Sequence, residues 1–220
     1  MLKVLVLSAV VSLLSSGHVS AAQRKVSRTA ERPEFESKVH SEINNVRQKP
    51  WKYAPNVAVY QDLLRGDVLY LKDRQPFLLN EGAKVLEIAR ENLLKRGITK
   101  PLTRSGTLDT VARSHLNDLL DNPQLGHRGK DGANLSKRIL RHAAISGPVG
   151  ENITYSDVTP RQAVLSMLID DGVETRQHRE NILNPDFALI GIACGITTQD
   201  KPICVIEFAT TLLPKGFEEF

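Results

Sequence analysis

Three short segments in the second half of the chain carry side chains that are able to do chemistry. The longest, residues 177–187, places His178 ahead of an Asn-Pro turn and an apolar run. The other two are Gly-His at 126–127 and Gly-Glu-Asn-Ile at 150–153. Imidazole and carboxylate groups on loops commonly bind metal ions or act as general acids and bases. Their spacing matches no local metal motif, so the residues alone leave a shared metal site and unrelated polar groups both open.

A fourth candidate lies at the end of a predicted helix. Residues 159–162 combine a capping box with proline at the first helical position, and the helix is expected to run to about Asp171. Asp170 and Asp171 would then lie at the negative end of the helix dipole, which costs about 0.3–1 kcal/mol per charge. We therefore expect a compensating cation or protonated histidine nearby. Asp170 shares the core-facing stripe with Ala163 and Met167.

Hydrophobic periodicity predicts the elements that must position these groups. Helices are expected from Pro33 to Pro50, from a cap at Asn80 to Arg96, from Leu108 to Leu120, and briefly after Gly132; strands are expected at 151–155, 190–197 and 203–210. Residues 51–79 follow no clear pattern. The third helix places His115 on its apolar face, where a core or rim histidine is a simpler interpretation than a ligand. Helices that flank a few strands with antiparallel connections favour an α+β or three-layer fold.

The two cysteines lie symmetrically about a predicted turn at residues 198–202. If the flanking strands form a hairpin, Cys194 and Cys204 lie opposite each other, and a disulfide is possible in an oxidising compartment. The loop is short, so the entropic gain would be about 2–3 kcal/mol. Two buried free thiols remain the alternative. Neither cysteine is placed as a nucleophile, because both fall inside strand patterns.

The N-terminal segment has the pattern of a signal peptide over residues 1–21. Lys3 precedes an apolar run at 4–14, and a small-x-small pattern ends at Ala21. The run is about half of the roughly 20 residues that a spanning helix needs, and no later segment approaches that length. An uncleaved membrane anchor remains the alternative. We expect a secreted protein, extracellular or periplasmic, with a flexible basic arm over residues 22–34 that is either a solvated linker or attracted to an anionic surface.

Composition excludes several classes of protein. The 220 residues are 41% hydrophobic and 25% charged, which suits one domain with a sizeable core. The formal charge of +4 is too small and too scattered to indicate nucleic-acid binding, and 5% aromatic residues leave little material for stacking bases. There is no G-x-S-x-G motif for a serine nucleophile. We therefore expect no nucleic-acid partner.

Taken in order, the motifs resemble those of the CAP superfamily, the cysteine-rich secretory, antigen-five and pathogenesis-related proteins, in its bacterial-type form. They are residues 126–129, 131–132, 150–153 and 178–187, followed by Ile-Gly-Ile at 190–192. The strong part covers Leu102 to Phe208, and the opening helix also fits. The resemblance implies a three-layer α-β-α sandwich with a mainly antiparallel central sheet over residues 35–210, followed by a tail at 211–220.

The resemblance also implies a cleft lined by two histidines and two acids. Residue by residue these match His127, Glu151, Asp170 and His178. The Asp170 position is counted from Met167, which replaces the family's tryptophan, and Asp171 remains an alternative. Such a tetrad suits Zn²⁺ at about 2.0–2.2 Å, with Glu151 or Asp170 as general base and Glu151 and His178 as the candidate catalytic residues. A plain polar cleft without a metal stays open, because the family has no established common activity.

Three functions follow as expectations. The first is metal-assisted hydrolysis, with peptides as the substrate class. The second is lipid or sterol carriage, which would need an apolar groove from the aromatic residues Trp51, Tyr53, Tyr60 and Tyr70. The third is an extracellular interaction module that uses the basic arm. The ligand is accordingly an unidentified extracellular lipid, peptide or cell-surface component.

Overall fold

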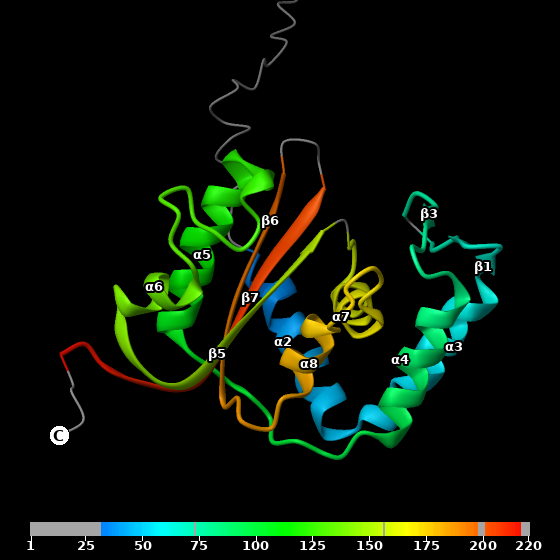
Figure 1. The fold of residues 1–220 in the computed structure, drawn as a ribbon, viewed down its shortest axis with the longest axis horizontal. Helices are drawn as coiled ribbons and strands as arrows, with labels where there is room; N and C mark the ends of the chain where they lie inside the picture. Colours follow the sequence, from blue (N-terminus) through cyan, green and yellow to red (C-terminus); the bar gives the residue numbers. More distant parts are fainter. Residues whose placement is uncertain (1–31, 73, 156, 198–200, 217–220) are drawn as a thin grey trace, which may run out of the picture.

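A four-stranded sheet forms the centre of the computed structural model, which describes residues 32–72, 74–155, 157–197 and 201–216 (Figure 1). Its strands, in spatial order, are β4 (Thr103–Arg104), β6 (Leu189–Ile196), β7 (Pro202–Pro214) and β5 (Ala143–Tyr155). The β6–β7 and β7–β5 pairs are antiparallel, and the short β4 joins β6 in parallel. The prediction of a mainly antiparallel central sheet is confirmed.

Helices cover both faces of this sheet. One face carries α5 (Gly106–Asp121) and α6 (Leu135–Leu140), and the other carries α2 (Pro33–Gln48), α7 (Pro160–Ile169) and α8 (Gln177–Leu183). Beyond α7 lie α3 (Ala54–Asp62) and α4 (Ala83–Lys95), with a small sheet of β1 (Leu64–Arg65), β2 (Val68–Leu69) and β3 (Phe77–Leu78) (Figure 1). Two short 3₁₀ turns, Pro50–Lys52 and Pro123–Leu125, complete the described elements. The expected α+β, three-layer α-β-α arrangement is therefore present.

The cores follow the predicted stripes. Val39, Ile43 and Val46 of α2 are fully buried in the larger core, which lies on the α2, α7 and α8 side of the sheet. The helix α7 starts as predicted, because Thr159 and Gln162 form a capping box and Pro160 occupies the first turn. Residues 51–79, which had no clear pattern, form most of a 3₁₀ turn, a helix and the whole of the small sheet.

Two predicted helix ends were wrong. Asn80 does not cap α4, whose N-cap is Gly82; instead its backbone N–H and side chain donate to Asp171 Oδ2. The helix α7 ends at Ile169 rather than Asp171, and Asp170 adopts a left-handed conformation with φ 59°. In both cases a tertiary hydrogen bond to an aspartate outweighs the local pattern.

The predicted domain limits shift slightly. The helix α2 begins at Pro33, inside the predicted basic arm, and β7 extends to Pro214, so that residues 211–214 of the predicted tail are strand. The predicted signal peptide, most of the arm and the turn at 198–200 lie outside the described residues. Within the part that is described, no helix is both long enough and apolar enough to cross a membrane.

The hairpin of β6 and β7 has the predicted register. Cys194 lies opposite Cys204, and the two form a disulfide with a Cα–Cα distance of 4.2 Å. Both cysteines are almost completely buried. The alternative of two free thiols is therefore wrong.

A buried arginine joins the first described helix to the segment before β6. Arg47 of α2 is completely buried. Its guanidinium donates to the backbone carbonyls of Lys100, Ile182, Asn184 and Phe187 at 2.7–3.2 Å. Burial lowers the pKa of Arg47 to about 10, so the side chain stays charged at neutral pH. Four carbonyl acceptors compensate this charge, which fixes α2 against the loop that precedes the central hairpin.

Candidate functional site

The four predicted site residues form two histidine–carboxylate pairs. His127 Nδ1 donates to Glu151 Oε1 at 2.8 Å, and His178 Nδ1 donates to Asp170 Oδ1 at 2.6 Å. In each pair the carboxylate is buried, with side-chain exposures of 3% for Glu151 and 1% for Asp170. The His127 side chain is 61% exposed and that of His178 is 21% exposed. Each imidazole is thus held at one nitrogen by a fixed acid and reaches towards solvent.

Asp170 reaches its histidine because of the turn at the end of α7. Its left-handed backbone turns the carboxylate towards the start of α8, where it accepts the backbone N–H groups of His178 at 2.8 Å and Arg179 at 3.2 Å. Arg176 donates to the Asp170 carbonyl at 2.7 Å. These donors supply the compensation predicted for an acid at the helix end.

The sequence reasoning did not assign a role to Arg138 of α6, which holds the other carboxylate. This arginine is 3% exposed, and its guanidinium forms an ion pair with Glu151 Oε2. It also donates to the backbone carbonyls of His127 at 3.1 Å and Ala133 at 3.2 Å. One buried side chain therefore fixes both members of the first pair, the acid directly and the histidine through its backbone.

A second acid lies behind Glu151. Glu207 of β7 is directly opposite Glu151 in the sheet and is completely buried, with its carboxylate 3.6 Å from the Arg138 guanidinium. Neither of its side-chain oxygens has a hydrogen-bond partner among the described residues. Burial, reinforced by the charge of Glu151, raises the pKa of Glu207 well above its usual range. Burial therefore disfavours a second negative charge at Glu207, while Arg138 balances the charge of Glu151.

His115 is a core histidine, as predicted. It is completely buried, and its Nε2 donates to the backbone carbonyl of Gly126 at 2.9 Å. Burial is the main cause that lowers the pKa of His115, so the ring is neutral at neutral pH. The ring lies 3.8 Å from Glu151 and supports the turn before His127.

A chain of side-chain amides connects the two pairs. Gln177 donates to Asn181 at 2.9 Å, Asn181 donates to Asn152 at 2.8 Å, and Asn152 donates to the backbone carbonyl of His178 at 2.9 Å. Asn152 and Asn181 are both buried. The bridge fixes α8 against β5, so the second pair lies beside the strand that carries Glu151.

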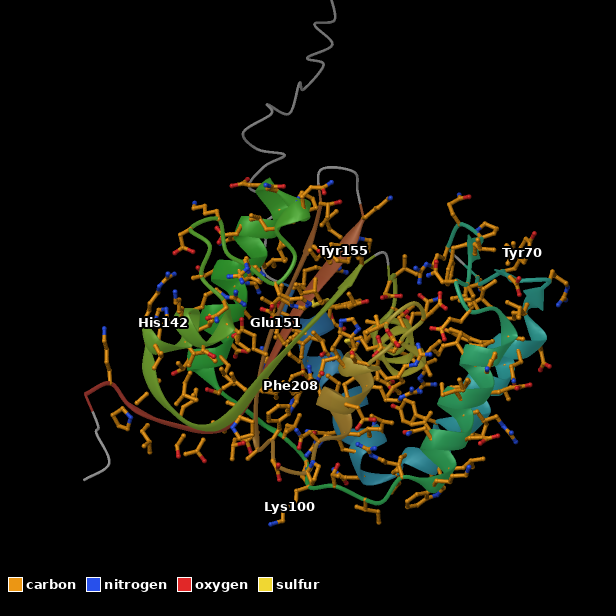
Figure 2. The ribbon with its side chains drawn as sticks, in the orientation of Figure 1. Tyr70, Lys100, His142, Glu151, Tyr155 and Phe208 are labelled. Carbon is orange, nitrogen blue, oxygen red and sulfur yellow. A yellow bond between two sulfur atoms is a disulfide. The ribbon has the colours of Figure 1, made fainter. Side chains whose placement is uncertain are left out.

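A cleft of about 470 Å³ opens at the first pair. It is lined by His127, Asn134, Leu135, Ser136, Val149, Gly150, Glu151, Gln177 and Asn181. Its floor is β5, and its walls are the start of α6 and the exposed side of α8. Figure 2 shows Glu151 on β5 in the middle of the molecule, with His142 well to one side. Asp170 and His178 do not line this cleft, so the structure brings the four residues together as two neighbouring pairs and not as one ring.

The donor atoms fit a divalent metal only in part. In the described residues, no group of three or more histidine, cysteine, aspartate or glutamate side chains is arranged to hold a metal ion. The carboxylates are engaged by the imidazole Nδ1 atoms and, for Glu151, by Arg138. The Nε2 atoms of His127 and His178 are the donor atoms that remain for a metal. Neither has a hydrogen-bond partner in the described part of the chain. A metal held there would need water to complete its shell.

Comparisons with known proteins agree with the motif order. A model of the cysteine-rich secretory protein family, CAP, matches residues 40–208. The uncharacterised protein YkwD of Bacillus subtilis is 30% identical over 109 residues, which are 50% of this chain and 40% of YkwD. The match therefore spans less than half of that curated relative.

The solved structures that this chain resembles are more distant in sequence. An outer surface protein of Borrelia burgdorferi is 21% identical with a TM-score of 0.43, and the match covers 69% of this chain and 100% of that protein. An extracellular protein of Bacillus anthracis that contains an SCP domain is 22% identical, with a TM-score of 0.40, over 57% of this chain and 37% of that one. NaASP2, solved with Zn²⁺, is 12% identical with a TM-score of 0.40, over 86% and 88% of the two chains.

Proposed function

This chain belongs to the cysteine-rich secretory protein (CAP) family, and on that basis we propose that it acts outside the cell and binds a divalent metal ion, best zinc, through His127 and His178. The observation that carries this proposal is the orientation of the two imidazoles. Each ring gives its Nδ1 hydrogen to a buried carboxylate, which leaves Nε2 as the atom with a free lone pair. Histidine ligands of zinc are commonly oriented by a carboxylate in this way.

The surrounding residues have distinct tasks in this proposal. Glu151 and Asp170 orient the rings. Arg138 neutralises Glu151, and burial disfavours a second negative charge on Glu207 behind it. The buried Glu151 carboxylate is already engaged by two partners, so we assign it to positioning, and His178 remains the candidate catalytic residue. A bound zinc ion would act as a Lewis acid towards a peptide carbonyl, which makes peptide hydrolysis the reaction to assay.

Titration calorimetry with zinc at neutral pH tests the proposal. The chain without residues 1–21 should bind one zinc ion, and a His127→Ala/His178→Ala double variant should lose that binding. His142→Ala is the matched control, because His142 is exposed and lies away from the cleft (Figure 2). Thermal unfolding confirms that each variant is folded. Equal zinc binding by the wild type and the folded double variant would refute a histidine-based site.

The lipid-carrier hypothesis gains no support. Tyr53 and Tyr60, two of the four aromatic residues that it required, are buried in the larger core. Tyr53 donates to the Glu42 backbone carbonyl at 3.1 Å, which explains its position. Trp51 and Tyr70 are 43% and 49% exposed on the outer part of the fold. We therefore carry the metal-binding cleft forward as the single proposed function.

A further inference from the structure

The two borders of the central sheet, that is, its two edges, differ in whether their outward-facing backbone groups are hydrogen-bonded. On one border, the short strand β4 pairs with β6 only at Leu189 and Ile190, which leaves the rest of β6 without a neighbouring strand among the described residues. On the other border, β5 is the last strand of the sheet. Unpaired backbone groups at such borders can hydrogen-bond an added strand, and proteins usually block them.

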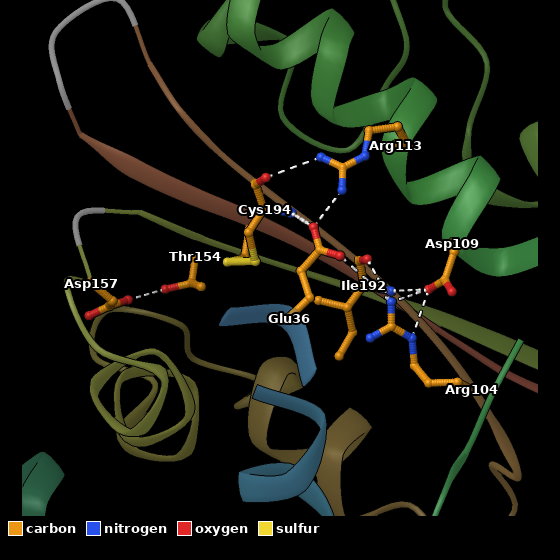
Figure 3. Close-up of a disulfide and its surroundings, with 9 residues drawn as sticks. Glu36, Arg104, Asp109, Arg113, Thr154, Asp157, Ile192 and Cys194 are labelled. Carbon is orange, nitrogen blue, oxygen red and sulfur yellow. Dashed lines mark hydrogen bonds and ion pairs between the residues drawn. A yellow bond between two sulfur atoms is a disulfide. The ribbon is translucent and has the colours of Figure 1, made fainter. Parts of the chain in front are cut away.

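Side chains close the β6 border. The Ile192 N–H donates to Asp109 at 2.9 Å, and the Ile192 carbonyl accepts from Arg104 at 3.2 Å. The Cys194 N–H donates to Glu36 at 2.9 Å, and its carbonyl accepts from Arg113 at 3.1 Å (Figure 3). Each outward-facing backbone group of these two residues therefore has a charged partner. An incoming strand would have to displace two ion pairs to bind there.

The β5 border is open where it forms the floor of the cleft. Asn181 donates to the Glu151 carbonyl at 3.3 Å, so the backbone groups of Glu151 point away from β7. Because an antiparallel strand alternates its hydrogen-bonding direction, those of Val149 point outward as well. Val149 lines the cleft, and no side chain in the described residues bonds its N–H or carbonyl. The β5 border is thus open at Val149, which lines the same cleft as His127.

We propose that this border binds an extended peptide segment as an added strand, which pairs with Val149 and lies between α6 and α8. This inference rests on the proposed function, because it names the ligand of the same cleft. The walls support it: Asn134 and Ser136 on one side and Gln177 on the other offer neutral amide and hydroxyl groups. Backbone pairing supplies the affinity in this mode of recognition, and the walls select neutral, polar side chains.

The test uses an acetylated, amidated hexapeptide of serine, threonine and valine, added to the ¹⁵N-labelled protein at millimolar concentration with EDTA present. The amide signals of Val149 and Glu151 should shift. Val149→Pro removes the outward N–H without a loss from the β5–β7 ladder, and it should weaken binding about tenfold. Tyr155→Pro makes the same change on the same border outside the cleft and should have no effect. Ser136→Trp should block the cleft sterically, which provides a second variant if Val149→Pro does not fold.

Two results would overturn the inference. One is the absence of shifts at Val149 and Glu151, and the other is equal binding of a peptide that is N-methylated at alternate residues and therefore unable to pair. The wild-type protein, titrated separately with zinc and with the peptide, separates the two proposals. Peptide binding without zinc binding would support the added strand and refute the metal site, whereas zinc binding without peptide binding would do the reverse.

Discussion

Replacing Arg138 with methionine removes the positive charge beneath the first histidine–carboxylate pair and keeps much of the side-chain volume. Arg138 is 3% exposed, and it serves the Glu151 carboxylate and two backbone carbonyls, those of His127 and Ala133. The substitution leaves Glu151 in a position with 3% side-chain exposure and no cation. It therefore tests whether the site depends on a buried charge balance.

The expected loss is large for a single substitution. Removal of one partner from a buried ion pair costs about 3–5 kcal/mol, because the other charge remains desolvated. A domain is stable by only about 5–15 kcal/mol, so Arg138→Met should lose a third or more of the free energy of unfolding. Glu151→Gln in the same chain removes the stranded charge and should recover about half of the loss.

Urea denaturation at neutral pH measures these effects, with the wild type, both single variants and the double variant forming a thermodynamic cycle. Arg141→Met is the matched control, since Arg141 is 52% exposed in its side chain and pairs with Asp131 at the surface. The control should lose much less than Arg138→Met. A loss below about 1 kcal/mol for Arg138→Met, or single effects that simply add in the double variant, would show that the pair contributes little.

Three further predictions concern the sheet. The pKa of Glu207 is raised in the folded state, so the folded protein holds a proton that the unfolded chain releases above pH 4.5. The cost of this group to the free energy of unfolding therefore grows as the pH rises. Glu207→Gln should stabilise the protein more at neutral pH than below pH 4.5, as measured by urea denaturation. Replacing Cys194 and Cys204 together with alanine should lower the free energy of unfolding by about 2–3 kcal/mol, whereas reducing agent should not affect that variant. Gly191→Ala would place a Cβ against the Leu108 backbone, with no room for it, and should lower the melting temperature. Gly97→Ala, where a Cβ meets nothing within 4 Å, serves as the control.

The central hairpin could be predicted from sequence because its signals are local. Alternation along β6 and β7 and the symmetric cysteines indicated one register, and the structure has that register. The first turn of α7 was predicted correctly for the same reason, since Thr159 and Gln162 bond to each other's backbone. Such features depend on residues that are close in the chain.

The end of α7 could not be predicted from local signals. Asp170 leaves the helix because its carboxylate accepts the backbone N–H groups of His178 and Arg179, and Asp171 accepts those of Asn80 and Glu81 before α4. The sequence alone showed only two acids in an unfavourable place. The expectation that something compensates them was useful, but it did not identify backbone amides as the donors.

The sequence pattern contained an indication of the buried charges behind the cleft. Glu207 occupies the same face of its strand as Val205 and Ala209, which period-two alternation places inside. Arg138 is adjacent to Ile139 on a short helix with an apolar face. An acid at an inward strand position and an arginine near an apolar stripe indicate a buried pair. The partner of each, however, follows only from the sheet register.

The contacts of Arg47 carry a consequence for the order of folding. This arginine bonds carbonyls that lie 135, 137 and 140 residues further along the chain. A chain that emerges N-terminus first makes α2 early, but three of the four acceptors for the Arg47 guanidinium are complete only after residue 187 has been added. Contacts of such long sequence separation slow folding, because the intervening chain must be ordered first. The α2 helix therefore takes its final place late, and a chain shortened before that segment would lack three of the four carbonyls that compensate the charge of Arg47.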